Sequence, residues 1–78
     1  MVKLERKLFV IAHNIRSLHN VGSIFRASDG FGVAKLYLTG YTGAPEGKNM
    51  EKIHKVALGA EEFVEWEHTR SLVRLITK

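Results

Sequence analysis

Hydrophobic residues are concentrated in three short runs that have the character of strands. Lys7 to Ala12 is a nearly continuous apolar run with β-branched and aromatic side chains, which is typical of a parallel strand covered on both faces. Lys35 to Thr39 predicts a second strand. Glu62 to Trp66 alternates between acidic and apolar residues, and this alternation favours a third strand at the edge of a sheet.

The residues between the first two strands have helical spacing. Apolar or small side chains recur at intervals of three, four and seven, which predicts a helix over 20–30 with a buried face formed by Val21, Ile24, Phe25, Ser28 and Phe31. Asn20 is a suitable N-cap because its side-chain oxygen can accept a backbone N–H of the first turn. One or two helical turns are expected within 51–60, after a long loop over 40–49 that contains Pro45.

A last helix is expected from Thr69, as its cap, to Thr77, with a buried face formed by Leu72, Val73, Leu75 and Ile76. The element order is then β-α-β-α-β-α over a single domain of residues 1–78. This order implies an α/β fold of three layers, with a short parallel sheet between helices. A first strand at the end of that sheet would have an open edge, which invites pairing with another chain.

Composition and charge narrow the possible functions. Twelve Lys and Arg against eight Asp and Glu give a net charge of +4 and a pI near 9.7. This balance favours an anionic partner such as nucleic acid, although a basic surface that only confers solubility fits it equally well. The absence of Cys excludes disulfides and Cys-based metal sites and fits a reducing compartment. No apolar run approaches the roughly 18 residues of a membrane span, so a cytoplasmic location is expected.

Polar and basic residues gather where the first strand passes into the first helix. This loop and the helix after it carry Asn14, Arg16, Ser17, Asn20 and Arg26. Ligands of open α/β folds bind beyond the carboxyl ends of the strands, and helix N-terminal N–H groups with a guanidinium suit a phosphate. On a helical wheel Gly22 lies on the same side as Arg26, where it would let a ligand or another backbone approach. The residues alone therefore predict an anion site for RNA or a phosphate.

The run from Asn14 to Gly32, NIRSLHNVGSIFRASDGFG, strongly resembles the first motif of the SpoU (TrmH-type) RNA methyltransferases, which belong to the SPOUT class. The similarity continues through KLYLTGYT at 35–42, and through ALGAE at 57–61 followed by FVEW at 63–66. It covers nearly the whole chain. The resemblance implies methylation of a ribose 2′-hydroxyl in tRNA or rRNA, with S-adenosylmethionine as the methyl donor.

The resemblance also implies roles for individual residues. Asn20 and Arg26 match the active-site Asn and Arg of the family, with Arg26 implicated in activating the hydroxyl or binding its phosphate. Asn14, Arg16 and Ser17 match the loop and are expected to contact RNA. Two later family motifs, which form the knotted part that holds the cofactor, do not occur in the 78 residues. The expected fold is therefore half of a SPOUT-type fold, without the C-terminal trefoil knot.

These observations leave three hypotheses. In the first, the chain is the N-terminal part of a SpoU-type methyltransferase domain, a truncated form that binds RNA through Arg16 and Arg26. It would then not bind S-adenosylmethionine by itself and would be inactive alone. In the second, the chain is a self-associating structural or RNA-binding module that pairs through the open edge of its first strand, without catalysis. In the third, an active site is assembled in trans with a separate second half.

Overall fold

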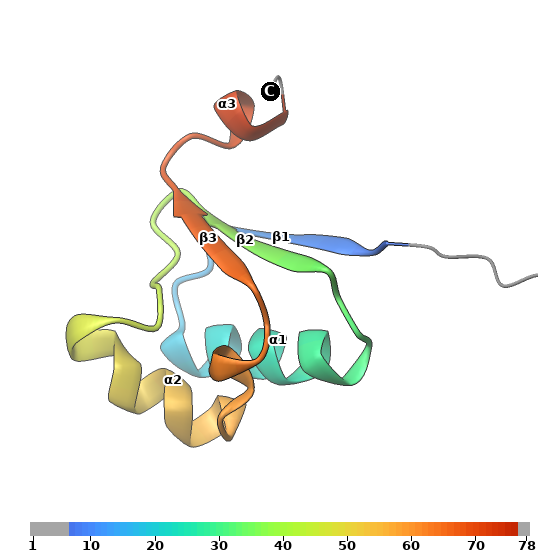
Figure 1. Ribbon diagram of the computed structural model, residues 1–78. Coiled ribbons are helices and arrows are strands. Elements are labelled where there is room, and N and C mark those ends of the chain that lie inside the picture. Colours follow the sequence, from blue (N-terminus) through green and yellow to red (C-terminus); the bar gives the residue numbers. More distant parts are fainter. Residues whose placement is uncertain (1–6, 77–78) are drawn as a thin grey trace, which may run out of the picture.

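The computed structural model describes residues 7–76 and contains the six expected elements in the expected order. They are β1 (Phe9–His13), α1 (Leu18–Gly30), β2 (Lys35–Thr39), α2 (Met50–Ala57), β3 (Trp66–Thr69) and α3 (Leu72–Ile76) (Figure 1). Two short 3-10 turns, Gly47–Asn49 and Ala60–Glu62, flank α2. None of the helices within residues 7–76 has the length and apolar character needed to cross a membrane.

The three strands form one parallel sheet in the order β1-β2-β3. Val10 is paired with Leu36, and Leu36 with Trp66, so the central strand β2 lies between the two others. Because all three strands run in the same direction, their carboxyl ends meet at one edge of the sheet. The loops that follow β1, β2 and β3 therefore lie close together, although they are far apart in the sequence.

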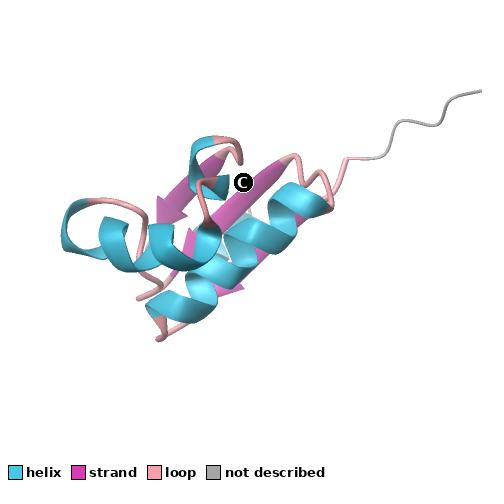
Figure 2. Ribbon diagram, turned by 90° about the horizontal axis from the view of Figure 1, so that it is seen from below, coloured by secondary structure: helices cyan, strands magenta, loops and turns pink. Residues whose placement is uncertain are grey.

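The helices are divided unequally between the two faces of the sheet. Both α1 and α2 pack on one face, where they lie side by side, whereas α3 lies on the other side near the carboxyl ends (Figures 1 and 2). Strands added in one direction with crossovers of the same hand place their crossover helices on the same face. The expectation that β1 is covered on both faces is wrong for this reason, since Phe9 and Ile11 are 53% and 45% exposed.

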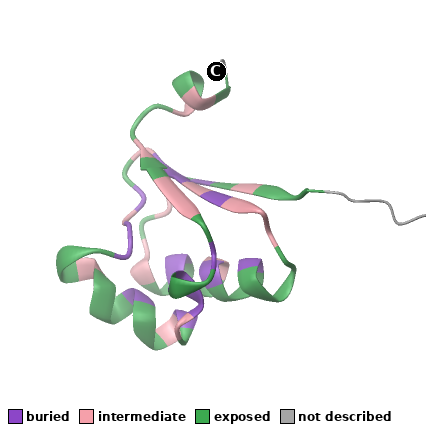
Figure 3. Cartoon of the chain, in the orientation of Figure 1, coloured by how far each residue is buried: buried purple, intermediate pink, exposed green. Residues whose placement is uncertain are grey.

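The hydrophobic core fills the space between the sheet and the two helices α1 and α2 (Figure 3). Its largest fully buried apolar side chains are Val21, Phe25, Leu36, Leu38 and Ile53. The Phe25 ring meets the Trp66 ring edge to face, with 6.5 Å between centroids and 86° between planes. Truncation of a buried Phe to Ala costs about 3–5 kcal/mol. Phe25 therefore holds α1 against the far edge of the sheet.

Gly22 is the point of closest approach between α1 and α2. A Cβ added to Gly22 would lie 2.8 Å from the Ile53 carbonyl oxygen and 2.8 Å from Val56 Cβ. The expectation that Gly22 would let a backbone approach α1 is confirmed, but that backbone is α2 of the same chain. Gly22 is buried in this contact, so its predicted position on the open side of the helix beside a ligand is wrong.

The first helix begins two residues earlier than predicted. Ser17, with an extended backbone, is its N-cap, and the Ser17 hydroxyl accepts a hydrogen bond from the Asn20 backbone N–H at 3.1 Å. Asn20 is therefore the third residue of the helix and not its cap. At the other end Phe31 lies just beyond Gly30, where the helix has stopped, and its side chain is 79% exposed. The prediction that Phe31 belongs to the core is wrong.

The third strand and the last helix are also shifted from their predicted positions. Glu62 ends a 3-10 turn and Phe63 is 79% exposed, so β3 starts only at Trp66, whose ring packs on the core. Thr69 is the last residue of β3, and Ser71 caps α3 by accepting the Arg74 N–H at 3.1 Å. The predicted buried face of α3 is wrong, because Leu72 and Leu75 are half-buried and Val73 and Ile76 are exposed. The predicted end at Thr77 lies outside the described residues.

Candidate functional site

The loop between β1 and α1 is held against the end of β2. Asn14 has a left-handed backbone (φ 53°), a conformation that Asn adopts more readily than most residues. Its N–H donates to the Thr39 carbonyl at 3.1 Å, and its side-chain Oδ1 accepts the Tyr41 N–H at 3.2 Å. Gly40 makes room for this contact, since a Cβ there would collide with Asn14 Oδ1. The Asn14 oxygen therefore holds the loop in place, which leaves its NH₂ group for an outside partner.

A buried hydroxyl supplies a second link between the same loops. Thr42 Oγ1 accepts the Ile15 N–H at 3.0 Å and lies 2.8 Å from the Thr39 carbonyl and 3.0 Å from the Ala12 carbonyl. Buried polar groups joined in this way stabilise one arrangement of the chain. Thr42 was not a predicted site residue, and its position in the resembling run KLYLTGYT was the only signal for it. The effect of both links is a rigid loop at the carboxyl edge.

Arg16 and Ser17 complete the loop in different ways. The Arg16 guanidinium carbon lies 5.8 Å from the centre of the Tyr41 ring, a cation–π contact that leaves the charge in solvent. Ser17 uses its hydroxyl as the cap of α1. Of the three loop residues expected to contact RNA, Arg16 thus presents its whole charged group to solvent, Asn14 only its NH₂ group, and Ser17 uses its hydroxyl within the fold.

The two predicted catalytic residues, Asn20 and Arg26, are both exposed on α1. They are six positions apart, so they are separated by about 9 Å along the helix axis and about 120° around it. Asn20 lies in the first turn, beside the loop, whereas Arg26 lies more than a turn further on. Asn20 is therefore next to the loop residues, whereas Arg26 lies at a distance from them along α1.

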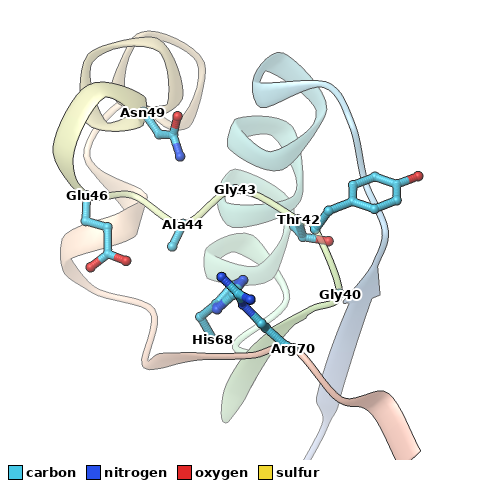
Figure 4. A pocket seen from close by; sticks show the side chains of 9 residues that line it. Gly40, Thr42, Gly43, Ala44, Glu46, Asn49, His68 and Arg70 are labelled. Carbon is cyan, nitrogen blue, oxygen red and sulfur yellow. The ribbon is translucent and has the colours of Figure 1, made fainter.

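A cavity of about 540 Å³ opens at the carboxyl ends of β2 and β3. It lies under the loop between β2 and α2. His68 and Arg70 line it at the end of β3, and Glu46 and Asn49 line it from the 3-10 turn before α2 (Figure 4). Sequence reasoning placed Arg70 on the last helix and missed this cavity. The cavity could have been predicted by applying to β2 and β3 the rule that ligands bind beyond the carboxyl ends of parallel strands.

The lining of this cavity does not suit S-adenosylmethionine. The sulfonium centre of that cofactor is cationic, so Arg70 would repel it while Glu46 would attract it, and charge does not decide the fit. An adenine ring is normally held between apolar walls, but the lining residues other than Tyr41 and Ala44 are polar or glycine. The residues that the structure describes therefore do not form a fitting pocket for this cofactor here.

One ion pair connects α2 to the turn that follows it. His54 Nδ1 lies 2.6 Å from Oε2 of Glu61, whose side chain is almost fully buried. The hydrogen bond that His54 donates to the Glu61 carboxylate raises the pKa of His54. Burial alone would raise the pKa of Glu61, but the His54 hydrogen bond and nearby backbone N–H groups outweigh it, so the pKa is lowered. This pair lies away from the loop, and its role is structural.

Residues 7–78 match the family model described as the SpoU rRNA Methylase family. The matched range contains the β1–α1 loop, the whole of α1 and the cavity at the carboxyl edge. A comparison with curated proteins finds no match.

Proposed function

Because the chain belongs to the SpoU rRNA Methylase family, whose members methylate RNA with S-adenosylmethionine as donor, we propose that it takes part in ribose 2′-O-methylation of tRNA or rRNA. In this proposal the β1–α1 loop and α1 face the RNA. The main support for this proposal is the rigid loop at the carboxyl edge. There the Asn14 side chain accepts a hydrogen bond from the Tyr41 N–H, and Arg16 extends into solvent. The proposed location is the cytoplasm, where these RNAs are found.

Arg26 and Asn20 are the proposed catalytic residues. The exposed guanidinium of Arg26 can approach a phosphate or the ribose, and its fixed positive charge would stabilise the 2′-oxygen as it becomes nucleophilic. Asn20, about 9 Å nearer the loop along the helix axis, can donate or accept a hydrogen bond to a neighbouring part of the RNA. Asn14 contributes its NH₂ group, Arg16 contributes charge, and Ser17 acts through the helix start that it caps.

We propose further that these 78 residues bind RNA without transferring a methyl group by themselves. The carboxyl-edge cavity supports this, because its lining residues other than Tyr41 and Ala44 are polar or glycine and offer little apolar wall for the adenine ring of the methyl donor. The test incubates the purified chain with tRNA and S-adenosylmethionine labelled with tritium in the methyl group. Retention of label in the RNA would contradict the proposed inactivity. Calorimetry with S-adenosylmethionine asks independently whether a donor site exists.

A second candidate function is self-association through the edge of β1. The position of β1 at one end of the sheet and the exposed Phe9 and Ile11 side chains favour it. A homo-oligomer of this kind would become more stable as the protein concentration rises. Sedimentation of the chain as a stable monomer at high concentration would count against this candidate.

A further inference from the structure

A groove of about 520 Å³ lies between the start of α1 and the outer side of α2. Its lining differs from that of the carboxyl-edge cavity, because it has no acidic residue. The apolar lining side chains are Leu18 and Val56. The remaining lining residues are one histidine and three basic residues, namely His19, Arg16, Lys52 and Lys55.

The packing of α1 on α2 explains why these side chains converge. Gly22 lets the two helices approach until Val56 lies against the α1 backbone. Lys52, Lys55 and Val56 are spaced i, i+3 and i+4, so they share one side of α2. Ile53 and Ala57, on the adjoining side, are buried in the core. The two lysines are thereby held beside the groove while α2 is fixed by its apolar face.

The charge of the groove is positive with little compensation. Glu51 lies 3.8 Å from Lys55, but both side chains are largely exposed, and such pairs on a helix surface are weak. The first turn of α1 contains no acidic residue, so the partial positive charge of the helix start is also uncompensated there. Three permanent cations, Arg16, Lys52 and Lys55, therefore face one groove.

We propose that this groove binds the phosphate backbone of RNA beside the β1–α1 loop. The inference rests on the proposed function and extends its RNA-binding surface to Lys52, Lys55 and His19. Arg16 belongs to both surfaces, since it lines the groove and also contacts Tyr41 at the carboxyl edge. An RNA strand bound in the groove would thus continue past Arg16 to Asn20. The lysine stems can lie on Leu18 and Val56 while their ammonium groups reach the phosphates.

The test measures binding of a fluorescently labelled tRNA by anisotropy, over a series of salt concentrations, for three forms of the chain. They are the unchanged chain, K52Q/K55Q and the matched control K7Q/K35Q. The control also removes two positive charges. Lys7 precedes β1, and Lys35 begins β2 on the sheet face away from α1 and α2. Circular dichroism checks that both variants fold. We expect this because Lys7, Lys52 and Lys55 are exposed, and because half-buried Lys35 forms only a 3.7 Å surface pair with Glu67.

We expect K52Q/K55Q to bind tRNA about tenfold more weakly at low salt and to lower the slope of log K against log salt by about 1.4–1.8, since each lost phosphate contact removes about 0.7–0.9. The control should match the unchanged chain. Equal losses in both variants, or none in K52Q/K55Q, would overturn the groove assignment and leave the proposed function intact. Failure of the unchanged chain to bind tRNA would overturn both. Binding of polyglutamate in the groove with no effect of K52Q/K55Q on tRNA would assign the groove to acidic peptides instead.

Discussion

The side-chain oxygen of Asn14 accepts the backbone N–H of Tyr41 at 3.2 Å and so joins the β1–α1 loop to the chain that leaves β2. The two residues are 27 positions apart in the sequence. Parallel strands bring them together, because the carboxyl ends of β1 and β2 lie side by side. The loop that we propose to face RNA is thereby built on the sheet and not on α1 alone.

This contact predicts a stability loss in Asn14→Ala. The variant loses one exposed hydrogen bond and places Ala in a left-handed conformation, which together cost about 1–2 kcal/mol. For a domain of this size, each kcal/mol lowers Tm by about 4–8 °C. Thermal unfolding followed by circular dichroism measures the loss. Asn14→Asp, which keeps the oxygen, should recover most of it. An unchanged Tm in Asn14→Ala together with lost RNA binding would instead assign Asn14 to RNA alone.

The close contact of α1 and α2 predicts opposite effects at two glycines of the same helix. Gly22→Ala should lower the free energy of unfolding by about 1–3 kcal/mol, because its methyl group meets the Ile53 carbonyl and Val56. Gly30→Ala meets nothing within 4 Å and should be neutral or slightly stabilising. Urea unfolding of both variants measures the difference. Similar stability of the two would contradict the packing described for Gly22.

The capping of α1 predicts different roles for Ser17 and Asn20. Ser17→Ala should lower the free energy of unfolding by about 1 kcal/mol, because the Asn20 N–H loses its acceptor. Ser17→Asp retains an acceptor and should restore stability. Asn20→Ala should change stability by less than about 0.5 kcal/mol, as expected for an exposed residue. Urea unfolding of the three variants measures these differences. A larger loss of stability in Asn20→Ala than in Ser17→Ala would show that Asn20, and not Ser17, is the N-cap.

The His54–Glu61 pair predicts a window of pH in which it stabilises the fold. The pKa of His54 is raised above 6.5, so its contribution is complete below pH 6.5 and is lost as pH rises through the folded-state value. The pKa of Glu61 is lowered below 4.5, so its contribution is present above pH 4.5 and is lost as pH falls. The pair therefore contributes most between about pH 4.5 and 6.5.

The free energy of unfolding, measured against pH for the unchanged chain and His54→Gln, tests this window. The difference between the two should be largest between pH 4.5 and 6.5 and should shrink on both sides. His68→Gln is a suitable control, because His68 lies at the carboxyl edge and not beside Glu61. A difference that is independent of pH would show that His54 stabilises α2 by packing alone.

Local spacing was sufficient to predict the order of elements, the parallel sheet and the position of β2. It could not choose between Ser17 and Asn20 as the cap, because both residue types cap helices and lie only three positions apart. The alternation over 62–66 looked like a strand, but Gly59 has a left-handed backbone (φ 89°) and starts a turn there. Trp66 begins the strand because its ring packs against Phe25, a contact across the fold that spacing does not reveal.

The candidate site was predicted less completely than the fold. The loop residues and Arg26 stood out because polar and basic side chains follow an apolar strand, and the resemblance then assigned their roles. The structural uses of Asn14 and Ser17 depend on partners at Tyr41 and Asn20 whose geometry appears only in the folded chain. The groove with Lys52 and Lys55 depends on how closely α2 packs at Gly22, which no pattern within α2 reports.

The most direct test of the RNA-facing surface is a nuclear magnetic resonance titration of the ¹⁵N-labelled chain with tRNA. We predict that amide shifts concentrate at residues 14–20 and around Arg26, Lys52 and Lys55, with little change at Phe9 and Ile11 on the opposite face of the sheet. Shifts confined to β1, or no shifts at tRNA concentrations well above that of the protein, would contradict the claim that the loop and α1 face RNA.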